Sequence, residues 1–241
     1  MKTRTLFLLI AALACLSLST AKADQPDGAY LDGGKSTVGV ILLHGRFAGR
    51  GDADSPVVGP LRKALHDRLG VHTLSLEYPQ TNRSRSASDE EGNFPAAHER
   101  IDQAIKFLTQ EKGVTQIYLM GHSLGTRITI SYMAANPNIP NLRGYIGVGI
   151  YGAGQCQDAT YYDPLATFCN LKTVLNKNPT FPVLDVVAMD TSDDVRYAER
   201  RRELVSATYQ QIRIDADHDF RHKEGDMLDT VTDWLKKQTG L

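Results

Sequence analysis

The chain has 241 residues, of which 41% are hydrophobic, 23% charged and 7% aromatic, and its formal net charge is −1. This composition is typical of an ordinary folded domain and excludes a disordered or fibrous protein. The balanced charge, with no long basic run, argues against a nucleic-acid partner, because a protein that binds nucleic acid needs a basic surface to contact the phosphates. The length fits one domain with room for a short insertion.

Residues 1–23 have the features of a cleaved export signal. Lys2 and Arg4 give a positively charged start, Leu6 to Leu18 is almost continuously apolar, and a small-x-small pattern that signal peptidase accepts ends at Ala23. The apolar stretch is too short to span a bilayer comfortably, and polar residues follow it. We therefore predict an exported protein, periplasmic or secreted, with no integral membrane segment left after cleavage.

Two alternatives to a cleaved signal stay open. One is a retained N-terminal anchor, and the other is a lipoprotein acylated at Cys15. Ala12 argues against acylation, because lipoprotein signals usually have leucine three residues before the cysteine. The folded domain is expected at residues 24–241.

Apolar β-branched runs alternate with amphipathic stretches along the rest of the chain, which predicts an α/β protein with a mainly parallel sheet. In chain order the expected elements are a strand at Val38–Leu43, a helix at Val57–Leu69, a strand at Val71–Glu77, a helix at Pro95–Glu111, a strand at Gln116–Met120, a helix at Gly125–Ala135, strands at Gly144–Ile150 and Val183–Ala188, a helix at Asp194–Ala207, a strand at Gln211–Ile214 and a helix at Gly225–Lys236. Most of these strands are continuous apolar runs, as expected of strands buried on both faces. We predict about six strands flanked by helices on both faces.

Two stretches interrupt this alternation. Thr81 to Asn93 is charged and almost without apolar residues, so we expect a solvated surface loop. Gly152 to Thr180 separates two strands and holds Tyr161, Tyr162 and Phe168. Its length predicts a short cap segment, residues 152–180, over a nearby site.

The cysteines bear on redox state and metal binding. Cys156 and Cys169 remain after signal cleavage, and because thiols tend to pair in an oxidising compartment, we predict a disulfide between them. Two separate buried thiols are the alternative. The three cysteines contain no C-x-x-C pair, and the chain has neither a P-loop nor a dinucleotide fingerprint, so we expect no metal and no cofactor.

The strongest chemical signal is Gly121-His122-Ser123-Leu124-Gly125, which matches the pattern G-x-S-x-G. It follows an expected strand and opens an expected helix, the setting that a nucleophile elbow requires. A turn this sharp crowds the backbone on either side of the serine, and glycine relieves that crowding. The alternative is a glycine-rich turn with no catalytic role.

At this point the chain resembles the α/β-hydrolase superfamily of esterases, lipases and their relatives, from Val38 to about Leu235. His44-Gly45-Arg46 is similar to the superfamily's His-Gly loop after an early strand. The resemblance implies an oxyanion hole formed by the backbone N–H groups of Arg46 and Leu124. It also implies a triad in the order Ser, acid, His.

The base implied by the resemblance is His218, which follows the last expected strand in Asp217-His218-Asp219-Phe220. It would take the proton from Ser123, because an unassisted serine hydroxyl is a poor nucleophile at neutral pH. His222, four residues later in a charged run, is the alternative base.

The acid is expected in the loop after the strand Val183–Ala188, where Asp190, Asp193 and Asp194 all lie. We predict Asp190, which is nearest the strand end, with Asp193 as its rival. An acid left out of the triad is expected to cap the helix that begins near Asp194.

The sequence thus predicts an exported serine hydrolase that cleaves carboxylic esters or thioesters through an acyl-enzyme on Ser123. Its partner is a small-molecule ester or acyl substrate, and the oligomeric state stays open. One alternative is an amidase or peptidase with the same triad. Another is a non-catalytic protein of the cell envelope that keeps the fold.

Overall fold

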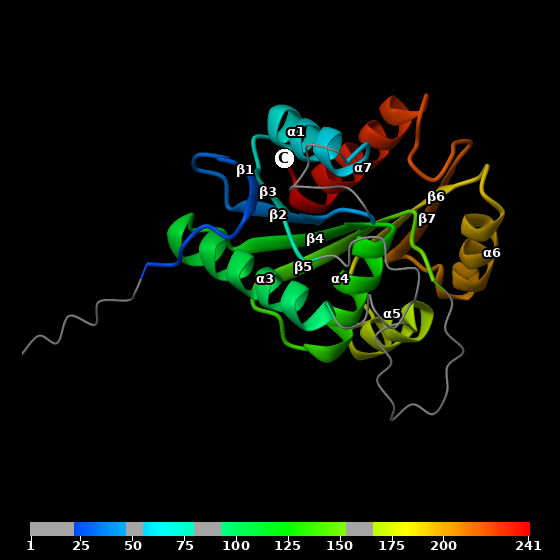
Figure 1. The fold of residues 1–241 in the computed structure, drawn as a ribbon, viewed down its shortest axis with the longest axis horizontal. Coiled ribbons are helices and arrows are strands. Elements are labelled where there is room, and N and C mark those ends of the chain that lie inside the picture. The colour runs from blue at the N-terminus through cyan, green and yellow to red at the C-terminus, as the bar shows by residue number, and fades with distance from the viewer. Residues whose placement is uncertain (1–21, 47–54, 80–92, 153–165) are drawn as a thin grey trace, which may run out of the picture.

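The computed structural model describes residues 22–46, 55–79, 93–152 and 166–241 (Figure 1). Most of the predicted export signal, nearly all of the predicted charged loop and residues 153–165 of the predicted cap lie outside the described residues. Cys156 lies outside them too, so its disulfide with Cys169 stays a prediction.

The described residues form one sheet of seven strands in the order β1-β3-β2-β4-β5-β6-β7. The strands are β1 (Gly28–Leu31), β2 (Val38–Leu43), β3 (His72–Leu76), β4 (Gln116–His122), β5 (Leu142–Val148), β6 (Val183–Ala188) and β7 (Tyr209–Ile214). All neighbours pair in parallel except β1, which is antiparallel to β3. The predicted mainly parallel sheet is confirmed, with β1 as an additional edge strand.

Helices cover both faces of this sheet. They are α1 (Val58–Leu69), α3 (Phe94–Lys106) with a π-helical turn after it (Phe107–Glu111), α4 (Leu124–Ala135), α5 (Thr167–Lys177), α6 (Ser192–Arg201) with a 3₁₀ turn after it (Arg202–Leu204), and α7 (Glu224–Thr239). Figure 1 shows α1 and α7 on one face, α3, α4 and α5 on the other, and α6 at the end of the sheet beside β6 and β7. The α/β architecture with two helical layers therefore matches the expectation.

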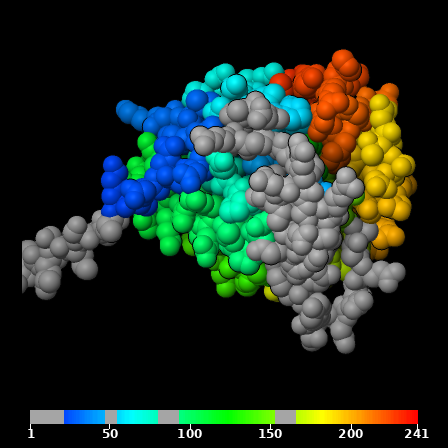
Figure 2. Space-filling view, viewed as in Figure 1, coloured from blue at the N-terminus to red at the C-terminus, as the bar shows by residue number. Residues whose placement is uncertain are grey.

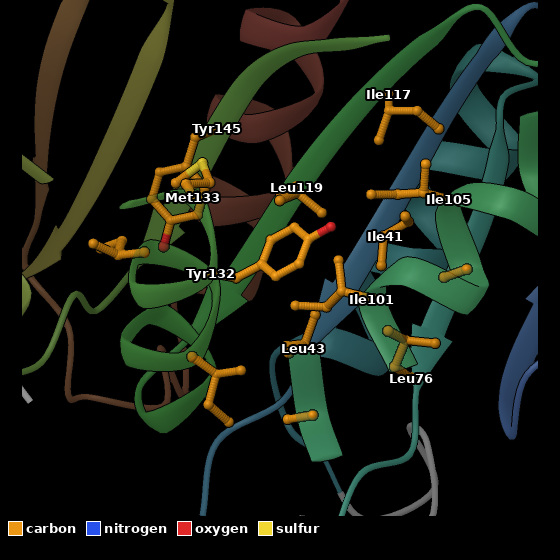
Figure 3. Close-up of a cluster of buried hydrophobic side chains, with 14 of the residues drawn as sticks. Ile41, Leu43, Leu76, Ile101, Ile105, Ile117, Leu119, Tyr132, Met133 and Tyr145 are labelled. Carbon is orange, nitrogen blue, oxygen red and sulfur yellow. The ribbon is translucent and has the colours of Figure 1, made fainter. Parts of the chain in front are cut away.

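Alternate residues of each buried strand feed two separate cores. Ile41 and Leu43 of β2 pack with α3 and α4 in the cluster that Figure 3 shows. Val40 and Leu42, which point to the other face, pack with α1 and α7. Because successive strand side chains point to opposite faces, one continuous apolar run supplies both cores.

The sequence did not predict β1 or α5. In β1, Gly28 has φ 148°, and a Cβ added there would lie 2.1 Å from the Ser75 carbonyl oxygen, so only glycine fits this close approach to β3. Within the predicted cap, Thr167–Lys177 forms α5, a crossover helix between β5 and β6 whose Leu171 and Val174 are buried in the same core as α4. The other part of the predicted cap, residues 153–165, lies outside the described residues, so the cap stays a prediction there.

A buried ion pair anchors α6 to the sheet. Arg201, in the last turn of α6, donates from Nε and Nη2 to the two carboxylate oxygens of Asp185 on β6, at 2.9 and 3.1 Å. Its Nη1 donates to the Ile150 carbonyl at 3.1 Å. Asp185 also accepts hydrogen bonds from the Tyr209 hydroxyl and the Gln211 amide, at 2.8 and 3.0 Å. The carboxylate of Asp185 therefore joins β6, α6 and β7, and Arg201 adds the segment after β5.

Removing one member of this pair should cost much of the protein's stability. Arg201→Met leaves a fully buried carboxylate without its cation, and breaking a buried pair in this way costs about 3–5 kcal/mol. Lys172→Met breaks the exposed Lys172–Glu203 pair and should cost under about 1 kcal/mol. Chemical denaturation of the two variants checks this difference. Similar losses of unfolding free energy in both would contradict the anchoring role.

Candidate active site

Ser123 lies at the sharp turn between β4 and α4. Its backbone has φ 52° and ψ −117°, an unusual conformation for a residue with a side chain, and such strain is characteristic of functional turns. The Ser123 amide donates to the Val148 carbonyl on β5 at 3.2 Å, and the Thr126 amide donates to the Ser123 carbonyl at 3.0 Å. The turn is thus held from the sheet and from the helix.

The two glycines of the motif are required by close backbone contacts. A Cβ added at Gly121 would lie 2.6 Å from the Gly125 carbonyl oxygen. A Cβ added at Gly125 would lie 2.2 Å from the carbonyl oxygen of Leu43 at the end of β2. Both distances are shorter than any side chain tolerates, so the expected steric reason for the motif is found here.

The His-Gly loop after β2 lies against this turn. A Cβ added at Gly45 would be 3.1 Å from Ser123 Cβ, so the backbone that leads to the Arg46 amide lies next to the serine. The loop is held by the Tyr78 hydroxyl, which donates to the His44 carbonyl, and by stacking of the His44 and Tyr78 rings at 4.5 Å. Leu124, the other expected oxyanion donor, is the first residue of α4. Its amide therefore has no carbonyl partner within the helix.

His218 lies in the loop between β7 and α7, and its Nδ1 donates to Asp194 Oδ2 at 2.7 Å. The Asp194 side chain is 2% exposed, whereas that of His218 is 29% exposed. Burial of the ring by itself lowers the pKa of His218, but the hydrogen bond and negative charge of Asp194 outweigh it, so the pKa is raised above 6.5. Figure 2 shows the surface of α6 beside that of the loop before α7, the two segments that bring these residues together.

The carboxylate that contacts His218 is therefore Asp194, and the predictions of Asp190 and Asp193 as its partner are wrong. Asp190 is exposed at the end of β6, beside Asp215. Asp193 is on the outer side of α6 and forms an exposed ion pair with Arg196 at 2.9 Å. The helix begins at Ser192, two residues earlier than expected, which turns Asp194 inward. The expected acidic cap is also missing, because Thr191 occupies that position and its side chain makes no capping hydrogen bond.

His122 links the elbow to the loop of His218. Its ring is buried, lies 5.2 Å from the His218 ring, and donates from Nε2 to the His218 carbonyl at 3.1 Å. Burial is the main reason that the pKa of His122 falls from 6.5 to about 4, so the ring is neutral at neutral pH. His222 is exposed, and among the described residues it is His218 that the Asp194 carboxylate contacts.

Comparison with solved structures identifies the architecture. An α/β serine hydrolase homologue from Coxiella burnetii matches with a TM-score of 0.59 and 18% identity, over 83% of this chain and 86% of the other. Dienelactone hydrolase from Anabaena variabilis matches with a TM-score of 0.60 and 16% identity, over 86% and 89% of the two chains. Est1E from Butyrivibrio proteoclasticus, solved with bound ferulic acid, matches with a TM-score of 0.61 and 15% identity, over 88% and 95%.

The chain has the α/β-hydrolase fold. A curated protein, the sn-1-specific diacylglycerol lipase ABHD11 of Mus musculus, is 25% identical over 109 residues, which are 45% of this chain and 32% of that protein. The chain therefore spans less than two thirds of the curated relative it matches. No family model matches the chain.

Within this α/β-hydrolase fold, the loops after β2, β4 and β7 carry the residues predicted as oxyanion donors, nucleophile and base, and the segment after β6 carries Asp194 in place of the predicted acid. Ser123, the backbone of Gly45 and the His218–Asp194 pair all lie at the carboxyl ends of the parallel strands, where open α/β sheets bind their ligands. In the described ranges no group of three or more His, Cys, Asp or Glu side chains is arranged to hold a metal ion. Among the described residues, no helix is both long enough and apolar enough to cross a membrane.

Proposed function

We propose that this protein is an exported serine hydrolase that cleaves carboxylic esters or thioesters through an acyl-enzyme on Ser123. The observation that carries the proposal is the 2.7 Å hydrogen bond between His218 and the buried Asp194, in a loop that His122, the residue before the strained Ser123, holds by its hydrogen bond to the His218 carbonyl. The names of the similar proteins, a dienelactone hydrolase and a diacylglycerol lipase, support esters as the substrate class. Export rests on the sequence of residues 1–23.

The proposed reaction begins with attack of Ser123 Oγ on the acyl carbonyl carbon, while His218 Nε2 takes the hydroxyl proton. The oxygen that becomes negative is stabilised by the amides of Arg46 and Leu124, each commonly worth about 3 kcal/mol. His218 then gives the proton to the leaving alcohol or thiol. Water attacks the acyl-enzyme by the same steps and releases the acid.

Asp194 holds the imidazole in this scheme. Because its carboxylate accepts from Nδ1, the proton of the neutral ring stays on Nδ1, and the lone pair of Nε2 is left to accept the proton of Ser123. Its charge also stabilises the imidazolium that forms in each half-reaction. Among the described residues none donates to its second oxygen, Oδ1, so the hydrogen bond to His218 is the one that orients this carboxylate.

The rate should depend on pH through His218. The base must be neutral to accept a proton, and Asp194 raises its pKa above 6.5, so kcat/KM should rise with pH and reach half of its plateau above that value. Steady-state kinetics on an acetate ester, from acidic to alkaline pH, measures this dependence of kcat/KM on pH. A profile that is flat across this range would contradict His218 as the base.

A panel of acyl compounds tests the proposed function itself. The purified mature protein is assayed on 4-nitrophenyl acetate, butyrate and palmitate, on an acyl thioester and on a 4-nitroanilide. Turnover of esters or of the thioester that is lost in His218→Gln is the expected result. Absence of turnover on all of them, with the protein folded, would overturn the proposal, and turnover of the anilide alone would favour an amidase.

A further inference from the structure

Two tyrosines that the proposed reaction does not use lie beside His218. Tyr151 follows β5, and its ring stands edge-to-face to the His218 ring at 6.2 Å and 71°. Tyr197, on α6, stands edge-to-face to Tyr151 at 5.3 Å and 84°. Both residues are partly exposed, so a row of aromatic rings that solvent reaches begins at the imidazole.

Tyr151 is fixed relative to the nucleophile. Its amide donates to Thr126 Oγ1 at 3.2 Å, and the same hydroxyl donates to the Ser123 carbonyl at 2.5 Å. The preceding backbone also touches the base, because a Cβ added at Gly149 would lie 3.1 Å from His218 Cε1. The backbone of Tyr151 is therefore held by contacts that also reach Ser123 and His218.

Tyr197 is fixed by α6, which also carries Asp194 one turn earlier. On its outer side the Arg196 guanidinium lies 5.0 Å from the ring centroid and donates to the Tyr197 hydroxyl at 3.1 Å. Arg196 is held in turn by its ion pair with Asp193. The ring thus has a cation on one side and Tyr151 on the other, and the residue is partly exposed.

The order of strands decides which part of a substrate reaches these rings. The His-Gly loop follows β2, on one side of the Ser123 strand β4, whereas Tyr151, Asp194 and His218 follow β5, β6 and β7 on the other side. The acyl oxygen must point to the Arg46 and Leu124 amides, toward β2. The leaving oxygen must lie within hydrogen-bonding reach of His218, so its substituent lies toward Tyr151.

We propose that Tyr151 and Tyr197 form the binding surface for the leaving group, and that the preferred substrates are esters of alcohols with a flat aromatic ring close to the ester oxygen. This inference rests on the proposed function. Edge-to-face and offset contacts with the two rings favour an aromatic group over a saturated group of similar size. The acyl side of the substrate is not subject to this preference.

The test compares benzyl acetate with cyclohexylmethyl acetate, whose leaving alcohols have similar size and acidity. The wild type should show kcat/KM about three- to tenfold higher for the benzyl ester. Tyr151→Leu and Tyr197→Leu should each bring this ratio close to unity, and Tyr197→Phe, which keeps the ring, should preserve it. Methyl phenylacetate and methyl cyclohexylacetate, which differ on the acyl side, should be hydrolysed with equal kcat/KM.

The outcomes distinguish a failure of the proposed leaving-group surface from a failure of the proposed hydrolase function. Hydrolysis of both acetates with a ratio near unity in the wild type would overturn the inference and leave the hydrolase proposal standing. A benzyl preference that survives both leucine variants, or an aromatic preference on the acyl side alone, would also overturn it. No hydrolysis of any of the four esters by folded protein would overturn both. Because the readout is a ratio, a variant with less folded protein still gives an answer.

Discussion

Ser123→Ala is expected to lower kcat for ester hydrolysis by about 10⁴- to 10⁶-fold. The acyl-enzyme cannot form without the hydroxyl, and what activity remains comes from binding and the oxyanion amides. The backbone of the elbow keeps its hydrogen bonds to Val148 and Thr126, so the variant should stay folded. Steady-state kinetics on a short-chain 4-nitrophenyl ester, with protein purified free of host esterases, measures the loss.

The matched control is Ser206→Ala. Ser206 is exposed and precedes β7, so it lies at the amino end of the parallel strands, away from the site. The activity of the Ser206→Ala variant should stay within about twofold of the wild type, as expected for a surface substitution away from the active site. A loss of less than tenfold in Ser123→Ala would show that another group is the nucleophile.

Asp194→Asn is the second large effect, with an expected loss of about 10⁴-fold in kcat. The amide has the size of the carboxylate but removes the negative charge, and it favours the wrong tautomer of His218 by donating to Nδ1. Because Asp194 raises the pKa of His218, the acidic limb of the residual pH–rate profile should also move to lower pH. A loss of packing alone would not move this limb.

Asp190→Asn and Asp193→Asn are the controls for this assignment, since both residues lie within four positions of Asp194 and, among the described residues, Asp194 is the one that bonds the His218 ring. Asp190 is exposed and Asp193 is paired with Arg196, so each variant should retain activity within about twofold. A large loss in Asp190→Asn together with an active Asp194→Asn would contradict the geometry of the site.

Most of the fold follows from patterns that the sequence carries locally. The parallel strands are continuous apolar runs, and Val38–Leu43 and Val183–Ala188 have the bounds that the sequence predicts. The edge strand β1 has no such run, because its place depends on close contact between Gly28 and Ser75 of β3. For α5 a signal existed, since Leu171 and Val174 have helical spacing, but the neighbouring glycines and aromatics indicated a loop.

The site was predictable where a motif fixes it. Ser123 and the glycines around it follow from backbone crowding at one turn, which is a local property. The triad acid was not predictable, because three aspartates lie within five residues and the choice among them depends on where α6 begins. The buried residues Asp194, Ala198 and Arg201 form one helical face, and this spacing was the available signal for Asp194.

Residues that hold the site from other segments could not be found from the sequence. His122 reaches the carbonyl of His218, which is 96 positions later in the chain, and Tyr78 reaches His44, which is 34 positions earlier. Tyr151 comes beside His218 only because β5, β6 and β7 are neighbours in the sheet. Such contacts follow from strand order, which no local pattern encodes.

Covalent labelling by a fluorophosphonate, followed by peptide mapping in a mass spectrometer, tests the central claim most directly. The reagent reacts with a serine that a neighbouring base has activated. We expect a single adduct per chain on the peptide that contains Ser123, no adduct in Ser123→Ala, and much slower labelling in His218→Gln. A folded wild-type protein that takes up no label, or one whose label persists in Ser123→Ala, would contradict the account.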